Sequence, residues 1–390
     1  MGKWSNRIPW LIGVVYWMLM IINGRFHLWD FHVYYGAAAD WLSGGAVYGK
    51  SYGLSSGFYK YSLTALIPFV PFTFLPYFWA SSLYYFGLLF LMVKFIRKWA
   101  KWLKNSNSHW SVTAVFWMVL IYFGDHLERE LFLGNINFLL LSLLMWFWYQ
   151  IQFAKWKWAG WILAFVCLVK PHFIIALPLI VLLKQWDLFK HYCIALCSLF
   201  LLPAILCGPF DFFELNQAWL KTMADHNAAL CESPNTLYGI FYPLIHQWIS
   251  EPKMGYVISV LLFVGILVLL LWNVWRKRSN ANLSILFFLV FALVPSLTHT
   301  DTEHFLFSMP LFLFILLSIE KSEKVGVIYL ALFLAMIPFL FNSPDLIGKK
   351  WSLRMDEGGL GWANLILIAV FFIRVLQGIL KNKTYIRLDS

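Results

Sequence analysis

About thirteen apolar stretches, each long enough to form a helix of several turns, leave this chain few folds other than a membrane-embedded one. Hydrophobic residues make up 61% of the sequence and charged residues 13%, against roughly 25% charged residues in soluble domains. Because the bilayer offers no water to backbone N–H and C=O groups, such stretches cross it as helices. The sequence therefore predicts an all-α polytopic membrane protein, one domain over residues 1–390. The apolar stretches are 8–24, 61–76, 77–96, 109–124, 138–152, 158–169, 171–183, 191–209, 254–275, 281–298, 304–320, 324–341 and 361–378.

Lysine and arginine cluster in the short connections between these stretches. The formal net charge is +11 at pH 7, and basic loops beside membrane spans mark the cytoplasmic side. This pattern predicts cytoplasmic termini, and a positive charge that reflects orientation rather than a nucleic-acid partner. The basic connections are 97–104, 155–157, 184–190, 276–278, 321–324 and the tail from Arg374.

The stretch 61–76 is the weakest candidate span, because Pro68, Pro71 and Pro76 interrupt it. If it is re-entrant or interfacial, the charge distribution leaves about twelve transmembrane helices and places the loop 25–60 outside. In the alternative topology, 61–76 crosses the membrane and 158–183 forms one bent span.

The polar, aromatic loop between Arg25 and Lys60 is expected to organise the outer side. Too short and too polar on one face to span a bilayer, its helix is expected to lie in the membrane interface. Asp30, at the start of this helix, is placed to act as a general base on a lipid-linked substrate. The alternative is that Asp30 only caps the helix. The residues that predict one helix face are Phe31, Tyr34, Tyr35, Ala38, Trp41 and Leu42.

Other predicted outer stretches place polar side chains beside apolar helices. The stretch 125–137 carries Arg129 and runs straight into an apolar helix that Asn135 could cap, which indicates either a wet cavity or a helix cap with an ion pair. Lys170, before Pro171, needs an anion, a cavity or a snorkelling position at a hairpin tip. The loop 210–253 offers amides such as that of Asn235 to sugar hydroxyls, or is only a solvated connector.

The segment His299–His304 contains two histidines and two carboxylates. Their spacing differs from the HExxH zinc motif, so we expect no metal ion in the site. His304, the first residue of an apolar stretch, is better placed to donate a hydrogen bond to a phosphate or a sugar.

Taken together, these motifs resemble the membrane glycosyltransferases of the GT-C fold, and most closely glycosyltransferase family 87. The most specific motif is Asp30-Phe31-x-Val33-Tyr34-Tyr35. Among the departures from the family pattern, Tyr61-Ser62-Leu63 stands where Tyr-Pro-Pro is usual. The other landmarks are Tyr48, Phe58-x-x-Tyr61, Leu133-Gly134-Asn135-x-Asn137-Phe138-Leu139-Leu140, Lys170-Pro171 and His304.

The resemblance implies a GT-C-like bundle and an inverting transfer of a hexose, expected to be mannose, from a polyprenyl-phosphate sugar to a lipid or glycan acceptor. It implies that Asp30 takes the acceptor proton, that Lys170 and His304 steady the lipid phosphate, and that no cofactor is needed. It also implies a multi-pass protein of a bacterial-type cytoplasmic membrane, with its site facing outward. The further substrate contacts expected by position are Tyr34, Tyr35, Arg129, Asn135, Asn137, Asn235 and Asp301.

The alternative function is a transporter or flippase of a lipid-linked glycan. A transporter needs a cavity with access to both faces of the membrane. The predicted inner connections are short and plain, with the polar stretches on the other side, and this asymmetry favours the enzyme.

Overall fold

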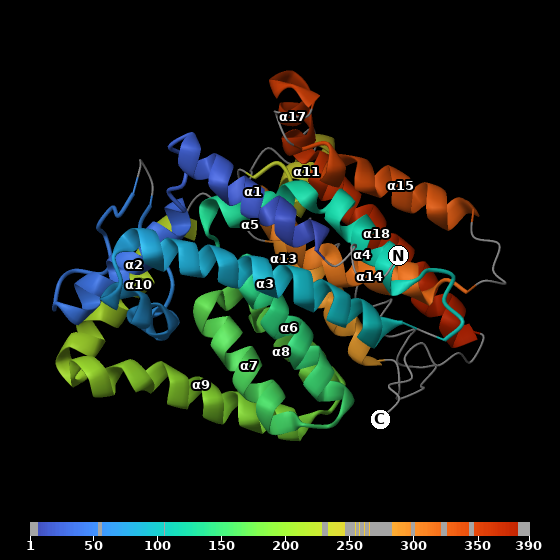
Figure 1. Ribbon diagram of the computed structural model, residues 1–390. Helices are drawn as coiled ribbons and strands as arrows, with labels where there is room; N and C mark the ends of the chain where they lie inside the picture. Colours follow the sequence, from blue (N-terminus) through green and yellow to red (C-terminus); the bar gives the residue numbers. More distant parts are fainter. Residues whose placement is uncertain are drawn as a thin grey trace. The chain divides into compact units, whose positions relative to one another are not determined.

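The computed structural model describes residues 7–53, 57–104, 106–227, 233–245, 283–297, 301–320, 326–342 and 347–380, with four single positions between 254 and 265. Helices dominate these residues, and the only strand pairing among them is two isolated bridges, Ser51 to Phe58 and Ser108 to Glu320. The elements, labelled in Figure 1 where there is room, are α1 (Ile8–Ile22), α2 (Trp29–Leu42), η1 (Leu63–Phe74), α3 (Tyr77–Leu103), α4 (Val112–Tyr122), α5 (Gly124–Leu133), α6 (Asn137–Gln152), α7 (Trp156–Val169), η2 (Pro171–Ile175), α8 (Ala176–Leu182), α9 (Trp186–Cys207), α10 (Pro209–Asn227), α11 (Leu237–Ile245), η4 (Leu283–Ile285), α13 (Leu286–Leu297), η5 (Thr302–Ser308), α14 (Met309–Ser318), α15 (Gly326–Leu340), α17 (Lys349–Arg354), η6 (Met355–Gly359) and α18 (Leu360–Leu380).

The predicted apolar stretches coincide with helices throughout the described residues, which confirms the all-α fold. The stretch 254–275 lies almost entirely outside them. Three helices are long and apolar enough to cross a membrane, at Tyr77–Leu103, Trp186–Cys207 and Glu357–Gln377, and α5 with α6 makes a fourth if this pair, bent by 117°, is one span. The remaining apolar helices have 10–17 residues. The count of about twelve spans therefore stays a prediction.

The segment η1 differs from a regular span in its geometry. It is a 3-10 helix of 12 residues with Pro68 and Pro71 inside it. Proline lacks the N–H that an α-helical hydrogen bond needs, and the tighter 3-10 turn is used in short pieces. These properties agree with a stretch that does not cross the membrane as an ordinary helix.

The chain divides into two compact units, described here separately. The first unit comprises residues 1–96, 127–174 and 184–226. In it α7 packs against α6 and α9, and η1 packs against α2, α7 and α9. Gly160 permits the crossing of α7 and α9, because a Cβ there would lie 2.7 Å from the backbone nitrogen of Tyr192. Thr64 on η1 donates from Oγ1 to the Leu199 carbonyl on α9 at 2.7 Å.

The second unit comprises residues 97–126, 175–183 and 227–390. Its α18 is tied to α13 and η5 through Asn364, a fully buried residue. The Asn364 Nδ2 donates to the Ala292 carbonyl at 2.7 Å and to Ser296 Oγ at 2.9 Å, while its Oδ1 accepts from Ser308 Oγ at 2.6 Å. A buried amide with all these partners fixes the register of three elements, because each unmet hydrogen bond would be costly.

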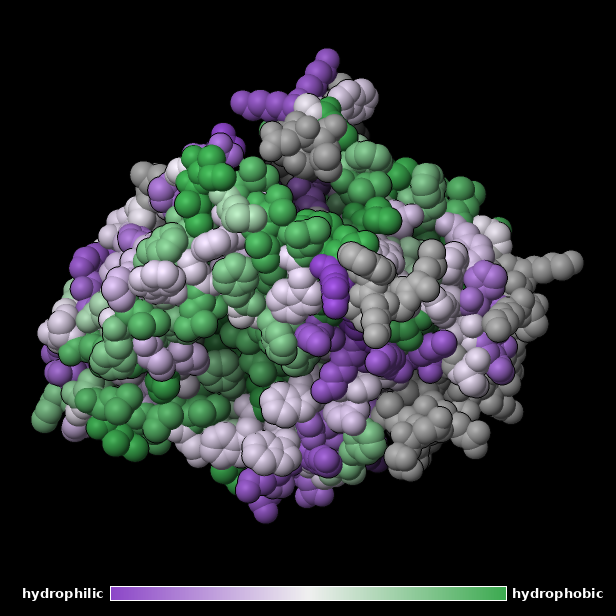
Figure 2. Space-filling view, in the orientation of Figure 1, coloured by the Kyte–Doolittle hydropathy of each residue, from purple (hydrophilic) through white to green (hydrophobic). Residues whose placement is uncertain are grey.

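Large apolar side chains are exposed on several helices of the first unit, as expected for lipid-facing surfaces. Figure 2 shows apolar side chains over the parts that α1 and α9 occupy in Figure 1. Soluble proteins rarely expose apolar patches of this extent. The exposed residues on these two helices are Ile8, Leu11, Ile12, Val15, Met18, Leu19 and Ile22 on α1, and Trp186, Ile194, Leu201, Leu202, Ile205 and Leu206 on α9.

Two sequence-based expectations change in detail. The helix predicted between Arg25 and Lys60 is present as α2, and most of its predicted face is buried, but Leu42 at its end is exposed. The stretch 210–253, predicted as a loop, contains α11 and nearly all of α10. Pro209 at the first position of α10 and Asp211 in its first turn are favourable helix-start residues, which the loop prediction overlooked.

Candidate active site

Asp30 lies in the first turn of α2 and is half-buried. The helix cap is not Asp30 but Leu28, which has left-handed backbone angles of φ 45° and ψ 67° and makes no side-chain cap. The prediction that Asp30 might serve as the N-cap is therefore wrong. The positive end of the helix dipole still favours a carboxylate at this position.

The turn between α5 and α6 lies against the start of α2. Gly134 has φ +67°, and a Cβ there would lie 2.8 Å from Phe31 Cβ and 3.0 Å from Leu28 Cβ. Tyr84 on α3 closes the same cluster: its hydroxyl donates to the Asn135 carbonyl at 3.1 Å, and its ring stacks on Phe31 at 4.5 Å between centroids. The backbone on both sides of Asp30 is thus held by close contacts, and these residues favour a fixed position for the carboxylate.

A buried polar chain connects α5, α6 and the end of α7. Lys170 Nζ donates to Asn137 Oδ1 at 2.5 Å, and Asn137 Nδ2 donates to Glu130 Oε1 at 2.7 Å. Glu130 Oε2 accepts from the backbone N–H of Phe138 at 2.9 Å and so caps α6. The exposed fractions are 4% for Lys170 and 0% for both Asn137 and Glu130. The Asn137 amide thus lies between a buried cation and a buried carboxylate, which offsets much of the cost of burying either charge.

This chain of hydrogen bonds answers the question that the sequence left open at Lys170. A snorkelling lysine at a hairpin tip would place its ammonium in water, whereas this ammonium is buried and hydrogen-bonded. Glu130 was not among the predicted site residues, although a carboxylate at a membrane entry is costly without a partner. Tyr84 was missed entirely, because a tyrosine within an apolar stretch gives no separate signal.

Tyr34 and Tyr35 point to different surroundings. Tyr34 is buried, with its ring 4.8 Å from Phe69 and 5.8 Å from Tyr61. Burial, followed by the Tyr61 hydroxyl and the Asp30 carboxylate, raises the pKa of Tyr34 well above its usual value. Tyr34 therefore stays a neutral hydrogen-bonding group near Asp30. Tyr35 is half-buried and donates to the Leu75 carbonyl at 2.9 Å.

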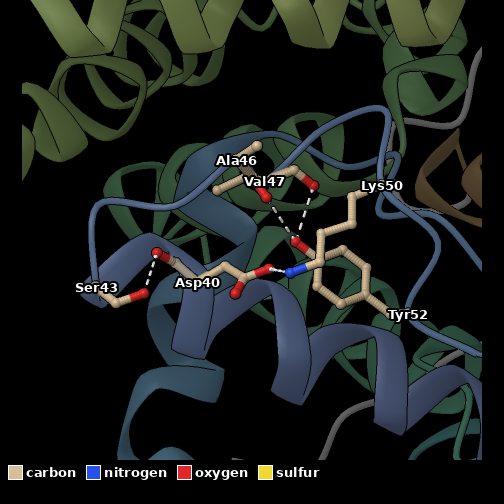
Figure 3. Close-up of polar contacts among 6 residues, drawn as sticks. All are labelled: Asp40, Ser43, Ala46, Val47, Lys50 and Tyr52. Atoms are coloured by element: carbon tan, nitrogen blue, oxygen red, sulfur yellow. Dashed lines mark hydrogen bonds and ion pairs between the residues drawn. The ribbon is translucent and has the colours of Figure 1, made fainter.

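The loop after α2 is fastened to that helix by a small polar cluster (Figure 3). Lys50 Nζ forms an ion pair with Asp40 Oδ2 at 2.6 Å, and the Tyr52 hydroxyl donates to the carbonyls of Ala46 at 3.0 Å and Val47 at 3.2 Å. Burial and the Asp40 carboxylate raise the pKa of Tyr52. Because Lys50 is largely exposed, this ion pair orders the loop more than it stabilises the fold.

Of the remaining candidates in the first unit, Arg129 is half-buried on α5. Asn135 was expected to cap α6, but the helix begins after Ile136, and Asn135 Oδ1 instead accepts from the Ile136 backbone N–H at 2.7 Å. The cap function belongs to Glu130, so Asn135 shapes the turn rather than the helix end.

Three predicted site residues belong to the second unit. His304 is half-buried in η5, its Nδ1 lies 3.3 Å from the Asp301 carbonyl, and its ring stacks with that of Phe307. Asp301 is exposed at the start of η5. Asn235 is buried, and its Oδ1 accepts from the Gly361 N–H at 3.0 Å, so it caps the beginning of α18. This hydrogen bond gives Asn235 a clear role in folding, separate from any contact with substrate.

Among the residues that the structure describes, no three His, Cys, Asp or Glu side chains are grouped as metal ligands would be. His299, one of the histidines in the motif considered for a metal, lies outside the described residues.

The model of glycosyltransferase family 87 matches residues 59–300, more than half of the chain. The chain belongs to glycosyltransferase family 87. No curated protein and no solved structure matches it. The matched range includes Arg129, Asn135, Asn137, Lys170 and Asn235, whereas Asp30, Asp301 and His304 lie outside it.

Membership in this family makes the protein a glycosyltransferase, and its apolar helices make it a membrane protein. The family 87 match covers the whole buried chain from Glu130 to Lys170. The resemblance suggested by the sequence motifs is thereby confirmed at the level of the family.

Proposed function

We propose that this glycosyltransferase moves a hexose, mannose in the simplest case, from a polyprenyl-phosphate sugar to a lipid or glycan acceptor at the outer face of a bacterial-type cytoplasmic membrane. The observation that carries the proposal is that Asp30 and the buried chain of Lys170, Asn137 and Glu130 belong to one unit and are linked through the contacts of Gly134 and Tyr84. A carboxylate that takes the proton and a cation that holds the phosphate are the two groups that such a transfer needs.

In this proposal Asp30 is the general base. The acceptor hydroxyl attacks the anomeric carbon, its proton passes to the Asp30 carboxylate, and the new C–O bond forms with inversion. The bond between the anomeric carbon and the phosphate oxygen breaks, and its electron pair leaves with the phosphate. Positioning a base within reach of the acceptor contributes about 10² to 10⁴ in rate.

Lys170 supplies the positive charge for the lipid phosphate, and His304 is proposed as a further phosphate donor. Charge-assisted hydrogen bonds to phosphate are about twice as strong as neutral ones. Tyr34, Tyr35, Arg129, Asn135 and Asn235 are proposed to contact the substrates. Asn137 acts as a positioning residue in this scheme, because its Oδ1 holds the ammonium of Lys170.

The reaction tests the proposal directly. Purified protein is incubated with radiolabelled polyprenyl-phosphate-mannose, other polyprenyl-phosphate hexoses, and total membrane lipid. Label that moves from the polyprenyl phosphate to a new product supports the transfer, and the donor that gives product identifies the sugar. If the protein is placed in sealed vesicles and the label stays on the donor but moves from one leaflet of the membrane to the other, the result would instead support a flippase.

A further inference from the structure

Two buried polar atoms beside the end of α7 have no hydrogen-bond partner among the described residues. They are Oγ of Ser62 and Nε2 of His172. Ser62 is 1% exposed. Leaving such a group without a partner costs about 1–3 kcal/mol, so an orphaned buried donor calls for an explanation.

The chain segment before η1, which carries Ser62, contacts the end of α7 four residues before His172. The Ser62 backbone N–H donates to the Leu168 carbonyl at 3.4 Å, and the Phe173 N–H donates to the Lys170 carbonyl at 3.2 Å as the chain turns into η2. The segment is held from other sides as well: the Tyr59 hydroxyl donates to the Ser62 carbonyl at 2.8 Å, and Trp219 Nε1 donates to the Lys60 carbonyl at 3.2 Å.

Positive charge surrounds this place. The charges of Lys170 and Lys60 both act on the His172 ring. Lys170 is buried, Lys60 is half-buried, and Lys60 directly precedes Tyr61 and Ser62 in the chain. Two lysine side chains and two polar atoms without a hydrogen-bond partner are unfavourable in a closed apolar core. They suit an anion with several acceptor oxygens, which can bind all four groups.

We propose that Ser62, His172, Lys60 and Lys170 form a binding site for a phosphate carried on a lipid. The proposal deepens the proposed function, because it names the residues of this unit that hold the leaving phosphate. Ser62 Oγ and His172 Nε2–H donate hydrogen bonds to its oxygens, and the two lysines supply the charge.

This composition favours the product of the transfer over the donor. A polyprenyl-phosphate sugar is a phosphodiester with one negative charge, whereas the released polyprenyl phosphate is a monoester that carries about −1.5 to −2 at pH 7. A site with two cations and two fixed donors binds the charge that develops as the bond to the sugar breaks. It stabilises the transition state more than the bound donor.

Binding is measured directly, without catalysis, to test the site. The probes are geranyl phosphate, geraniol and inorganic phosphate, added to the full-length protein in detergent and followed by calorimetry. The variants are Ser62→Ala and His172→Phe. The matched controls are Ser81→Ala, a buried serine on α3 whose Oγ already donates to the Phe78 carbonyl, and His191→Phe on α9, whose Nδ1 lies 2.7 Å from the Asp187 carbonyl.

Each of the two site variants should weaken geranyl phosphate binding about ten- to a hundredfold, as expected for one hydrogen bond to a charged group. The controls should bind it as the wild type does. Ser62→Ala should also leave the melting temperature of the ligand-free protein unchanged or higher, because it removes an orphaned hydroxyl. A structural hydroxyl would give the opposite result, a lower melting temperature with unchanged binding.

The probes separate the possible sources of the anion. Tighter binding of geranyl phosphate than of geraniol and inorganic phosphate supports a lipid phosphate. Inorganic phosphate that binds equally tightly contradicts the lipid assignment, and wild-type affinity in both site variants contradicts the site. If the wild type binds geranyl phosphate but transfers no sugar, the proposed function is overturned and the binding site stands. If the wild type transfers sugar but both site variants bind geranyl phosphate as tightly as it does, the binding site is overturned and the proposed function stands.

Discussion

The ammonium of Lys170 donates to the amide oxygen of Asn137 at 2.5 Å, and both residues are buried. Because lysine can only donate and an ionised carboxylate can only accept, this contact orients the amide so that its nitrogen faces Glu130. One amide therefore serves a cation and an anion that are distant in sequence, and its loss leaves both without this partner.

We expect Asn137→Leu to lower the free energy of unfolding by about 3–5 kcal/mol, since it breaks a buried charge network while keeping the branched shape of the side chain. The measurement is thermal unfolding of the purified protein in detergent. Asn216→Leu is the control, because Asn216 is a half-buried asparagine on α10 whose Nδ2 donates only to the Phe212 carbonyl in its own helix. Equal effects of the two variants would show that the network adds no particular stability.

Asp30→Asn should reduce transfer by about 10² to 10⁴, because the amide has the same shape but cannot accept a proton. Its melting temperature should stay near that of the wild type, since Asp30 does not cap α2. Asp40→Asn, on the same helix, removes the exposed ion pair with Lys50 and should leave transfer nearly unchanged. Turnover of Asp30→Asn at the wild-type rate would exclude Asp30 as the base.

Gly134→Ala should impair both stability and transfer, and Gly24→Ala provides a close comparison. Both glycines have a positive φ, +67° at Gly134 and +64° at Gly24, but a Cβ at Gly24 meets nothing within 4 Å. Both variants carry the cost of a Cβ in the left-handed conformation, about 1–2 kcal/mol, and only Gly134→Ala displaces Leu28 and Phe31 next to Asp30. If the two variants have equal transfer rates, the contact of the turn with α2 has no influence on the base.

We expect no requirement for a divalent metal. The proposed leaving group carries a single phosphate, and lysine side chains offset its charge. Transfer is measured after treatment with a chelator and again after addition of manganese or magnesium. Activity that disappears with the chelator and returns with either ion would assign a metal-binding role to the acidic segment around Asp301 and Glu303.

The predicted topology is tested with single cysteines at Ser43 and Lys155 in a variant that lacks the five native cysteines. Both positions are exposed, and they lie in the predicted outer and inner connections. A membrane-impermeant thiol reagent added outside intact cells should label position 43 and leave position 155 unlabelled. Labelling of position 155 from outside would require a different arrangement of spans.

The apolar helices of the described residues could be predicted from apolar length, because a membrane leaves the backbone no other solution, whereas α10, in the stretch predicted as a loop, could not. The start of α2 could not be predicted to the residue. Its cap, Leu28, has left-handed angles and is fully buried, against the preference for Asp or Ser at helix starts. Contacts with distant parts of the chain hold such a residue in place, as with Gly134, so local sequence preferences mislead here.

The site could be predicted in its charges but not in its connections. Lys170 attracted attention because a lysine between apolar stretches is costly, yet nothing in the sequence pointed to Asn137 as its partner. Ser62 stood out only as a departure from the family pattern, and neither it nor His172 indicated a binding site, since a serine and a histidine are ordinary residues until their burial and missing partners are known.

The shortness of α7 has a consequence for the donor itself. Its 14 residues give a length of about 21 Å, against a hydrocarbon core of about 30 Å. A helix of this length that starts at the inner boundary ends about 9 Å below the outer one. In the proposed reaction, the phosphate that reaches Lys170 must then leave the plane of the lipid headgroups and draw its sugar down with it. A long, flexible isoprenoid tail can bend to permit this descent. A donor anchored by two straight acyl chains would have to push both chains deeper into the membrane than the chains of the neighbouring lipids.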